Sequence, residues 1–397
     1  MWFANFFIAS SMTMILPFIS LYIESFGNFT DSYVQTWSGL VFGVTFVSAF
    51  IAAPIWGRIG DKYGRKNILI ISSSGLALSV LLMGFATTVW QLFLLRLFMG
   101  LFTGFIPMSQ ALISTQTPKK TAGKILGTLQ TAGVSGSLLG PLIGGVLADS
   151  VGYSATFKLV SMSIFVSAII VKFGIKEMQL KVTSQADNKL YSTREVLKHI
   201  VSHPVLLVVM LTSTLVQVAH FSIQPIISLY VIEINGPEQI SFYAGLTFSA
   251  AGLGSLLFVK PWGKLGDRFG HANMLILLLI LAAVAYFPGA FVTNIWQLVA
   301  LRFLVGSAIG GILLSRIAYI RNEAPLSMQG EVIGYNTSLQ FLGNIIGPSL
   351  GGILSAMYGF SSIFFVTSSL LIGTSLLLTF VILKREHPNK KLATHKT

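Results

Sequence analysis

Twelve long apolar segments, separated by short polar stretches, decide what this chain can fold into. About 20 consecutive apolar residues in a helix are needed to cross the hydrocarbon of a bilayer. Only 10% of the residues are charged, whereas soluble proteins keep about a quarter. The sequence therefore predicts an all-α integral membrane protein. Its twelve transmembrane helices are expected at 2–23, 36–56, 67–87, 90–113, 125–148, 155–175, 204–232, 242–261, 274–293, 296–319, 332–355 and 362–383.

The net charge of +13 is distributed as a membrane topology requires. If both termini are cytoplasmic, the 26 Lys and Arg lie in or beside cytoplasmic segments, except Arg96 and Arg302 within helices and Lys158 near an outer loop. This bias orients membrane chains. Nucleic-acid binding is disfavoured, because the sequence shows no soluble basic domain. The outer side collects carboxylates, namely Glu24, Asp31, Asp149, Glu233 and Glu238.

The sequence contains a duplication. WGRIGDKYGRKNIL at 56–69 returns as WGKLGDRFGHANML at 262–275, and GSLLGPLIGG at 136–145 returns as GNIIGPSLGG at 343–352, offsets of 206 and 207. Each copy holds an even number of helices, so the two six-helix bundles are parallel and a substrate site is expected between them. The expected parts are the bundles 1–175 and 204–383, a cytoplasmic linker 176–203, and a disordered cytoplasmic basic tail 384–397.

The stretch 56–66 concentrates charge in a chain that has little of it. We expect a loop between helices, in which Gly57, Gly60 and Gly64 permit a tight turn and Asp61 caps a helix start or faces a helix dipole. A topology signal alone would explain the basic residues. It would not explain an Asp between glycines at the same place in both copies.

This stretch resembles the loop signature of the major facilitator superfamily, Gly-x-x-x-Asp-(Arg/Lys)-x-Gly-Arg-Lys. The resemblance implies a conformational latch whose Asp engages the other bundle in the outward-facing state. The second copy has His271 and Ala272 in place of the final basic pair, so its latch is expected to be weaker. The implied latch residues are Gly57, Asp61, Lys62, Gly64, Arg65 and Lys66, with Gly263, Asp267, Arg268 and Gly270 in the second copy.

The spacing of Gly and Pro in the fifth helix resembles the signature of the drug:proton antiporter branch of this family, in particular the quinolone-type multidrug exporters of Gram-positive bacteria. There the bend is thought to block leakage and marks exporters. Small residues also pack helices closely in membranes, which is the plainer explanation for any one glycine. The bend residues are Gly136, Gly140, Pro141, Gly144 and Gly145, repeated as Gly343, Gly347, Pro348, Gly351 and Gly352.

Proton coupling needs a group that changes protonation as the protein alternates, yet the middle of each expected helix lacks Asp and Glu. Arg96 matches the family's helix-4 arginine and is implied to take part in proton transfer, although it cannot itself titrate near neutral pH. Snorkelling to the interface is the alternative for Arg96 and Arg302. The coupling candidates are Glu24, Asp61, Arg96, Asp149, His220 and Glu233.

Polar side chains on two helices suggest a substrate cavity. Gln217, His220, Phe221 and Gln224 share one helix face. Gln340 and Asn344 precede the second Gly-Pro bend. Interhelical hydrogen bonding is the alternative role. The cavity candidates are Gln217, Phe221, Gln224, Gln340 and Asn344.

These features favour a secondary transporter of the bacterial plasma membrane that exports amphipathic drugs in exchange for protons. Export of a specific metabolite or sugar is the alternative. A nucleotide-binding loop and clustered catalytic groups are lacking, so neither a primary pump nor an enzyme is expected. A channel is disfavoured because the chain duplicates within itself. We expect a monomer that uses no metal and no cofactor, with the proton gradient as its energy source and lipids as neighbours.

Overall fold

Helices are the regular elements of this computed structural model, which describes residues 1–117, 119–177, 193–325 and 328–393. The first half comprises α1 (Trp2–Met14), η1 (Leu16–Phe18), α2 (Ile19–Glu24), α3 (Asp31–Tyr63), α4 (Arg65–Met83), α5 (Val89–Gly100), α6 (Phe105–Gln116), α7 (Lys119–Val151) and α8 (Tyr153–Gly174). The second half comprises α9 (Thr193–Ser202), α10 (Pro204–Ser222), η2 (Gln224–Ile226), α11 (Ile227–Asn235), α12 (Ile240–Phe269), α13 (His271–Tyr286), η3 (Phe287–Phe291), α14 (Ile295–Glu323), α15 (Gln329–Tyr358) and α16 (Phe360–Ala393).

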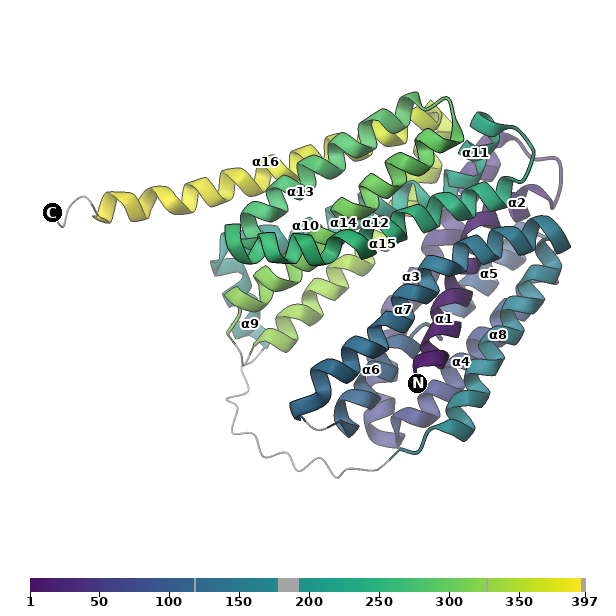
Figure 1. Ribbon diagram of the computed structural model, residues 1–397, viewed down its shortest axis with the longest axis horizontal. Coiled ribbons are helices and arrows are strands. Elements are labelled where there is room, and N and C mark those ends of the chain that lie inside the picture. Colours follow the sequence, from purple (N-terminus) through teal and green to yellow (C-terminus); the bar gives the residue numbers. More distant parts are fainter. Residues whose placement is uncertain (118, 178–192, 326–327, 394–397) are drawn as a thin grey trace.

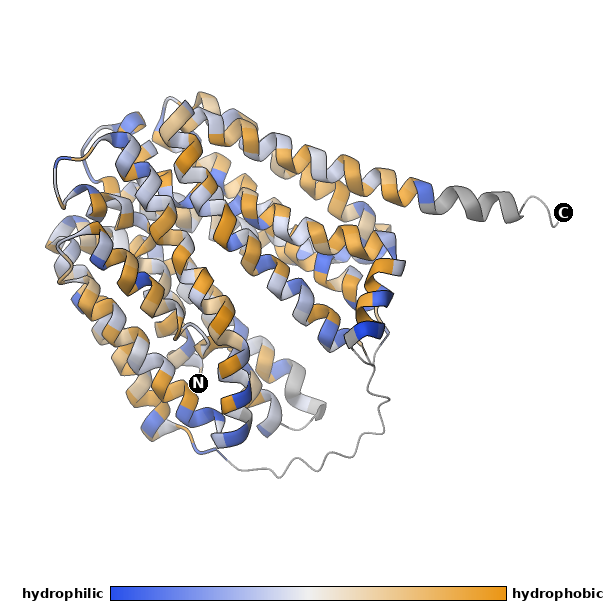
Figure 2. Cartoon of the chain, turned by 180° about the vertical axis from the view of Figure 1, so that it is seen from behind, coloured by the Kyte–Doolittle hydropathy of each residue, from blue (hydrophilic) through white to orange (hydrophobic). Residues whose placement is uncertain are grey.

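These elements form two bundles, and the twelve expected membrane helices are confirmed within the described residues. Each bundle has its own buried apolar core, one built from α1–α8 and the other from α9–α16. Figure 1 shows the first bundle in purple and blue and the second in green and yellow. Residues of hydrophobic type predominate along the helices, while hydrophilic residues are more frequent toward the helix ends (Figure 2). This distribution suits a bilayer rather than water.

The two ends of the molecule differ in charge and in packing. We call the end that carries Gly64, Gly270 and α9 the basic end, and the end that carries Glu24, Asp149 and Glu233 the acidic end. The bundles meet along α3 with α15 and along α7 with α12. They lie together near α2 and α11 and diverge toward α6 and α9 (Figure 1). The helices of the two bundles are therefore in contact at the acidic end and apart at the basic end, and we call these the closed and the open end.

The expected loop at 56–66 is corrected by the structure. Residues 56–63 continue α3, and a single residue, Gly64 with φ of 94°, separates it from α4. The second copy turns in the same way at Gly270, with φ of 85°. One left-handed glycine is enough to end a helix and start the next. Asp61 therefore lies inside a helix and does not cap one, and its side chain is outside the described part.

Two spans are interrupted by proline at matching places. The first expected helix is α1, η1 and α2, with Pro17 in the 3-10 turn, and the seventh is α10, η2 and α11, with Pro225 in its turn. Proline lacks the N–H that would continue the helix. The fourth span is also divided, into α5 and α6, whereas the corresponding tenth is the unbroken α14.

Helix is present in both polar segments of the chain, the linker and the C-terminal tail. The linker contains α9, whose Val196 and Ile200 are buried, while its residues 178–192 lie outside the described part. The tail expected to be disordered is helical through Ala393, as a continuation of α16, and residues 394–397 are outside the described part. A helix that is already formed extends at little cost through Lys, Arg, Glu and Leu, which are good helix formers.

Candidate substrate cavity and conformational contacts

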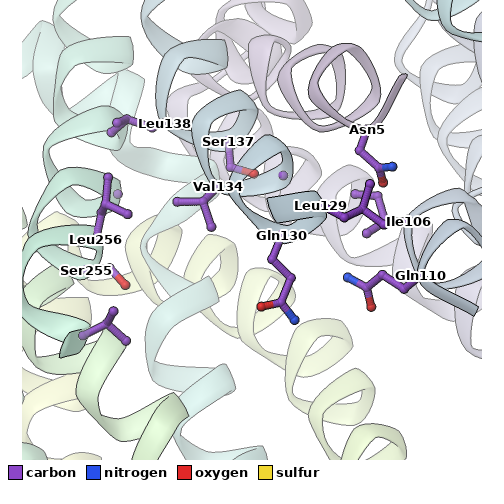
Figure 3. Close-up of a pocket in the computed structure, with 13 residues that line it drawn as sticks. Asn5, Ile106, Gln110, Leu129, Gln130, Val134, Ser137, Leu138, Ser255 and Leu256 are labelled. Carbon is purple, nitrogen blue, oxygen red and sulfur yellow. The ribbon is translucent and has the colours of Figure 1, made fainter. Parts of the chain in front are cut away.

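A cavity of about 520 Å³ lies between the bundles, with walls from α1, α6 and α7 on one side and α12 on the other. Figure 3 shows the amides of Gln110 and Gln130 on the side of the first bundle and Ser255 and Leu256 on the side of the second. None of its thirteen lining residues is charged. Its polar lining residues are Asn5, Gln110, Gln130, Ser137 and Ser255.

The first bundle turns one face of α7 toward this cavity. Gln130, Val134 and Ser137 follow i, i+4 and i+7, and all three are exposed in the structure. Gly133, on the same wall, has no atom within 4 Å of the position that a Cβ would take. The remaining lining is mostly aliphatic, including Ile106 and Leu256. The wall thus offers apolar contact with a few hydrogen-bonding groups, a common composition for small-molecule sites.

Two further hollows adjoin the cavity. One of about 450 Å³ lies near Met1 and Lys124 and shares the lining residue Leu129. The other, about 700 Å³, is a groove between α7, α12 and α14 that shares Leu138 and is lined by apolar residues and Ser249. At Leu138 helices α7 and α12 touch, since the Ser249 hydroxyl on α12 donates to the Leu138 carbonyl oxygen at 2.7 Å, so this contact lies between the cavity and the apolar groove.

The predicted bend residues pack helices against each other. A Cβ on Gly140 would lie 2.5 Å from the carbonyl oxygen of Ser10 on α1, and one on Gly144 would lie 2.0 Å from that of Met14. In the second copy, a Cβ on Gly351 would lie 1.8 Å from the carbonyl oxygen of Ser222 on α10. These separations leave room only for hydrogen. Close packing is thus observed at these positions, and the role in preventing leakage stays a prediction.

Other glycines of the same set join the two bundles. A Cβ on Gly145 would lie 2.1 Å from the carbonyl oxygen of Ser241 on α12, and one on Gly352 would lie 2.5 Å from that of Gln35 on α3. Both contacts lie toward the acidic end. By contrast, Gly127 and Gly334, near the basic end of α7 and α15, have no atom within 4 Å.

Asp149 adds a polar contact across the closed acidic end. From the last turn of α7 it accepts hydrogen bonds from the backbone N–H groups of Ser241, at 3.2 Å, and Phe242, at 2.8 Å. These N–H groups start α12 in the other bundle and have no partner within their own helix. A carboxylate there also meets the positive end of the helix dipole. Asp149 therefore stabilises the closed acidic end.

The first latch segment is held within its own bundle. The carboxylate of Glu177 accepts from the backbone N–H groups of Arg65, at 2.8 Å, and Lys66, at 2.9 Å, at the start of α4. The Arg65 guanidinium donates to the carbonyl oxygen of Ala111 and to the hydroxyl of Thr115 on α6. Lys62 is exposed, and Gly57 has open space beside it. The role of these residues as a latch stays a prediction.

The second latch segment has a different set of contacts. Asp267, whose side chain is 79% exposed, forms an ion pair of 3.4 Å with His271 one turn later when that His is protonated. Arg268 lies over the ring of Phe269. Gly263 lies opposite the side chain of Leu314, and Gly270 forms the turn. Asp267 faces the open basic end, where a partner from the other bundle would have to approach.

The coupling candidates are dispersed. Glu24 and Glu233 lie at the acidic end, on α2 and α11, and line one pocket. His220 and Gln224 are within 3.1 Å of each other on one face of the seventh span, and the roles of donor and acceptor depend on the His tautomer. Arg96 is buried, its Nε donates to the carbonyl oxygen of Val41 at 3.3 Å, and its guanidinium lies over the ring of Phe42. Arg96 does not snorkel.

The cavity candidates lie on α10, η2 and α15, away from the lining of the 520 Å³ cavity. Phe221 packs edge-to-face against Phe46 of the first bundle, with ring centroids 5.3 Å apart. Gln217 lies beside Gly343, Gln340 is half-buried, and Asn344 is buried with its Oδ1 unbonded in the described part of the chain. Their contribution to substrate binding stays a prediction.

Two groups of buried or cavity-lining polar residues were not predicted from the sequence. Arg316, counted as a residue of the basic end, is fully buried in α14, and its three guanidinium nitrogens have no hydrogen-bond partner within the described residues. Arg302, four turns earlier on the same face, is also buried. The cavity residues Gln110, Gln130 and Ser137 were missed because isolated neutral polar residues are common in membrane helices. The i, i+7 spacing of Gln130 and Ser137 was the available signal.

Two parallel six-helix bundles around a central cavity define a membrane transporter of the alternating-access class. The family model of the Major Facilitator Superfamily matches residues 1–259 and 222–397, and the chain belongs to this family. Its members are transporters rather than enzymes.

Relatives cover nearly the whole chain. The chain is 52% identical over 378 residues to the uncharacterized MFS-type transporter YuxJ of Bacillus subtilis, covering 95% of this chain and 96% of that protein. It is 39% identical over 372 residues to the multidrug resistance protein MdtG of Salmonella typhi, covering 94% and 91%. Among solved structures, a bacterial homolog of the human lysosomal transporter Spinster, inward-facing and occupied, gives a TM-score of 0.79 at 14% identity, covering 96% and 94%. That likeness concerns the fold.

Proposed function

We propose that this protein exports amphipathic, drug-like molecules from the cytoplasm by alternating access. The observation that carries the proposal is the uncharged cavity between the bundles, which combines aliphatic walls with three amides and two hydroxyls. Such a lining accepts molecules of varied shape, because apolar contact is not directional and each amide both donates and accepts. Similarity to MdtG, which is named a multidrug resistance protein, supports the same substrate class.

The orientation of the protein in the membrane follows from the charge asymmetry. Basic residues favour the cytoplasmic side of bacterial membranes, so the open basic end faces the cytoplasm, and an exporter in this state would take up its substrate there. The apolar groove between α7, α12 and α14 offers apolar contact to molecules dissolved in the membrane, and entry from it to the cavity would require α7 and α12 to separate at Leu138. Export then requires opening of the acidic end.

Exchange for protons is the proposed energy source, with no cofactor. One charge moved through 100 mV is worth about 2.3 kcal/mol, which supports roughly fifty-fold accumulation per proton. Proton release on substrate addition to purified protein tests this step, with the variants Asp61→Asn, Glu24→Gln and His220→Ala. We expect at least one variant to lose the release. Parent-like release from all three would remove these coupling candidates.

Dye efflux from energised cells tests the function. Cells that express the protein should accumulate less ethidium, and a protonophore should abolish the difference. Gln130→Leu should change the half-saturating dye concentration several-fold, whereas Thr379→Val should not, because the Thr379 hydroxyl bonds only within α16. Dye accumulation that ignores both expression and the protonophore would refute the proposal. Uptake screens with sugars and metabolites in vesicles test the alternative of a specific solute.

A further inference from the structure

A second cavity between the bundles lies at the acidic end, remote from the substrate cavity. It measures about 320 Å³, and we call it the acidic-end pocket. Glu24, Asp31 and Gln35 of the first bundle form one side, and Ile232 and Glu233 of α11 with Phe360 of α16 form the other. Because both bundles contribute walls, the pocket exists only while the acidic end is closed.

The polar groups of this pocket are hydrogen-bond acceptors. Glu24, Asp31 and Glu233 are exposed carboxylates at its rim, and no basic residue lines it. Gln35 is only 8% exposed, and its carbonyl oxygen Oε1 has no hydrogen-bond partner in the described part of the chain. A buried acceptor without a donor is costly, and such groups usually have a partner. The pocket is therefore complementary to a ligand that brings hydrogen-bond donors or positive charge.

The other lining residues indicate whether a metal ion or an organic cation fits this pocket. Among the described residues, no three His, Cys, Asp or Glu side chains converge closely enough to hold a metal ion. The lining instead combines the three carboxylates with apolar side chains, including Ile232 and the aromatic Phe360. An aromatic face attracts organic cations, and the volume falls in the range of small-molecule sites, about 300–1,000 Å³.

We propose that the acidic-end pocket binds an organic ammonium ion and thereby stabilises the conformation that is closed at this end. The cation lies among the three carboxylates, its hydrocarbon part contacts Ile232 and Phe360, and any N–H group donates to Gln35. Opening of the acidic end separates Glu24 and Asp31 from Glu233 and dismantles the site. A ligand that binds one of two conformations shifts the equilibrium toward it. The inference goes beyond the proposed export, since binding is measurable without transport.

The test uses the full chain, which has no cysteine of its own. Gly133→Cys places a reporter in the substrate cavity, where a Cβ meets open space. Tetraethylammonium, titrated into the purified protein, should raise the rate of maleimide labelling at this position saturably, and KCl at equal ionic strength should not. In Glu24→Gln/Glu233→Gln the half-saturating concentration should rise about tenfold or more, because two charge contacts are lost.

Two further variants separate the pocket from general surface charge. Gln35→Leu should weaken the response to butylammonium several-fold, since the acceptor for its N–H groups is removed, and should leave the response to tetraethylammonium, which has no N–H group, nearly unchanged. Glu238→Gln should leave it unchanged, because Glu238 is an exposed acidic-end carboxylate that does not line the pocket. An equal response to KCl, a parent-like double variant, or an equal loss in Glu238→Gln would overturn the inference. If the parent protein exports no dye but still responds to tetraethylammonium, the proposed function is refuted and the inference about the pocket stands.

Discussion

The two bundles share their helix packing but only part of their charge pattern. Gly140 and Gly144 pack α7 on α1 as Gly347 and Gly351 pack α15 on α10, and proline interrupts the first and seventh spans alike. Charged residues follow this symmetry only in part: Asp61 and Arg96 have counterparts in Asp267 and Arg302, but other charged positions do not. At offsets of 206 and 207 residues, Gln110 of the cavity corresponds to buried Arg316, and Asp149 corresponds to Ala356.

This difference separates two requirements. Close helix contact must exist twice, because each bundle has to hold together and to rock against the other as a rigid unit. Charge placement decides which conformation is favoured and what binds, and a duplicated chain is free to specialise there. The glycine contacts therefore reflect architecture, and the unmatched polar residues are where mechanism is expected.

The largest effect is expected from filling an inter-bundle glycine. Gly145→Leu places atoms against the carbonyl of Ser241 and costs about 3 kcal/mol or more of closure at the acidic end. Labelling of the Gly133→Cys reporter should then fall more than tenfold, and Gly352→Leu should act alike if the copies are mechanically equivalent. Gly127→Leu, which meets open space, is the control. Unchanged labelling in Gly145→Leu would show that the close contact at Gly145 does not hold the acidic end closed.

Removing the buried charge of the second bundle should raise stability. Arg316→Met replaces a guanidinium without a hydrogen-bond partner in the described chain by an apolar side chain, which we expect to increase the free energy of unfolding by about 1–4 kcal/mol. The corresponding Gln110→Met, at the cavity, should change it by less than about 1 kcal/mol. Chemical unfolding in detergent measures both, with exposed Arg321→Met as the control. If Arg316→Met instead lowers the free energy of unfolding, the Arg316 guanidinium takes part in a stabilising interaction.

A smaller effect concerns the cap that only the first bundle provides. Asp149→Asn keeps the size of the side chain but removes the charge at the start of α12, a loss of about 1 kcal/mol. The balance between the two conformations should shift about fivefold toward opening of the acidic end. Lower labelling of the Gly133→Cys reporter measures this shift. If labelling of Asp149→Asn equals that of the parent, the charge of Asp149 does not contribute to closure of the acidic end.

The smallest expected effect is local to the turn at Gly64. Glu177→Gln removes the charged acceptor of the Arg65 and Lys66 N–H groups, worth about 0.5–1 kcal/mol. Hydrogen exchange at these two amides should quicken several-fold. The amides of His271 and Ala272 serve as the internal control, because Leu383 stands 206 residues after Glu177. Equal acceleration in both copies would indicate a global effect.

Much of the fold could be predicted because membrane insertion acts on local sequence. Apolar length alone specified twelve spans, and the repeat at 206 residues specified two parallel bundles. The ends of helices were less predictable. A basic, glycine-rich stretch such as 56–63 looks like a loop, yet it is the last part of α3, because Trp56 and Gly60 pack against other helices of the bundle and the helix ends only at Gly64.

The candidate site was predictable only in kind. Gln110, Gln130 and Ser255 come from three different spans, and nothing local marks them as neighbours. His220 and Gln224 were correctly placed on one face, where they interact with each other. Glu24 and Glu233 were named separately, and only the closure of the bundles brings them into one pocket with Asp31 and Gln35.

The sequence by itself determined the class of protein, the number of spans and the duplication, because hydrocarbon selects long apolar helices one at a time. Tertiary structure alone decided which end is closed, which polar residues share a cavity, and that Arg316 is buried. These depend on how two preformed bundles pack against each other, and that packing depends on contacts between residues far apart in the chain.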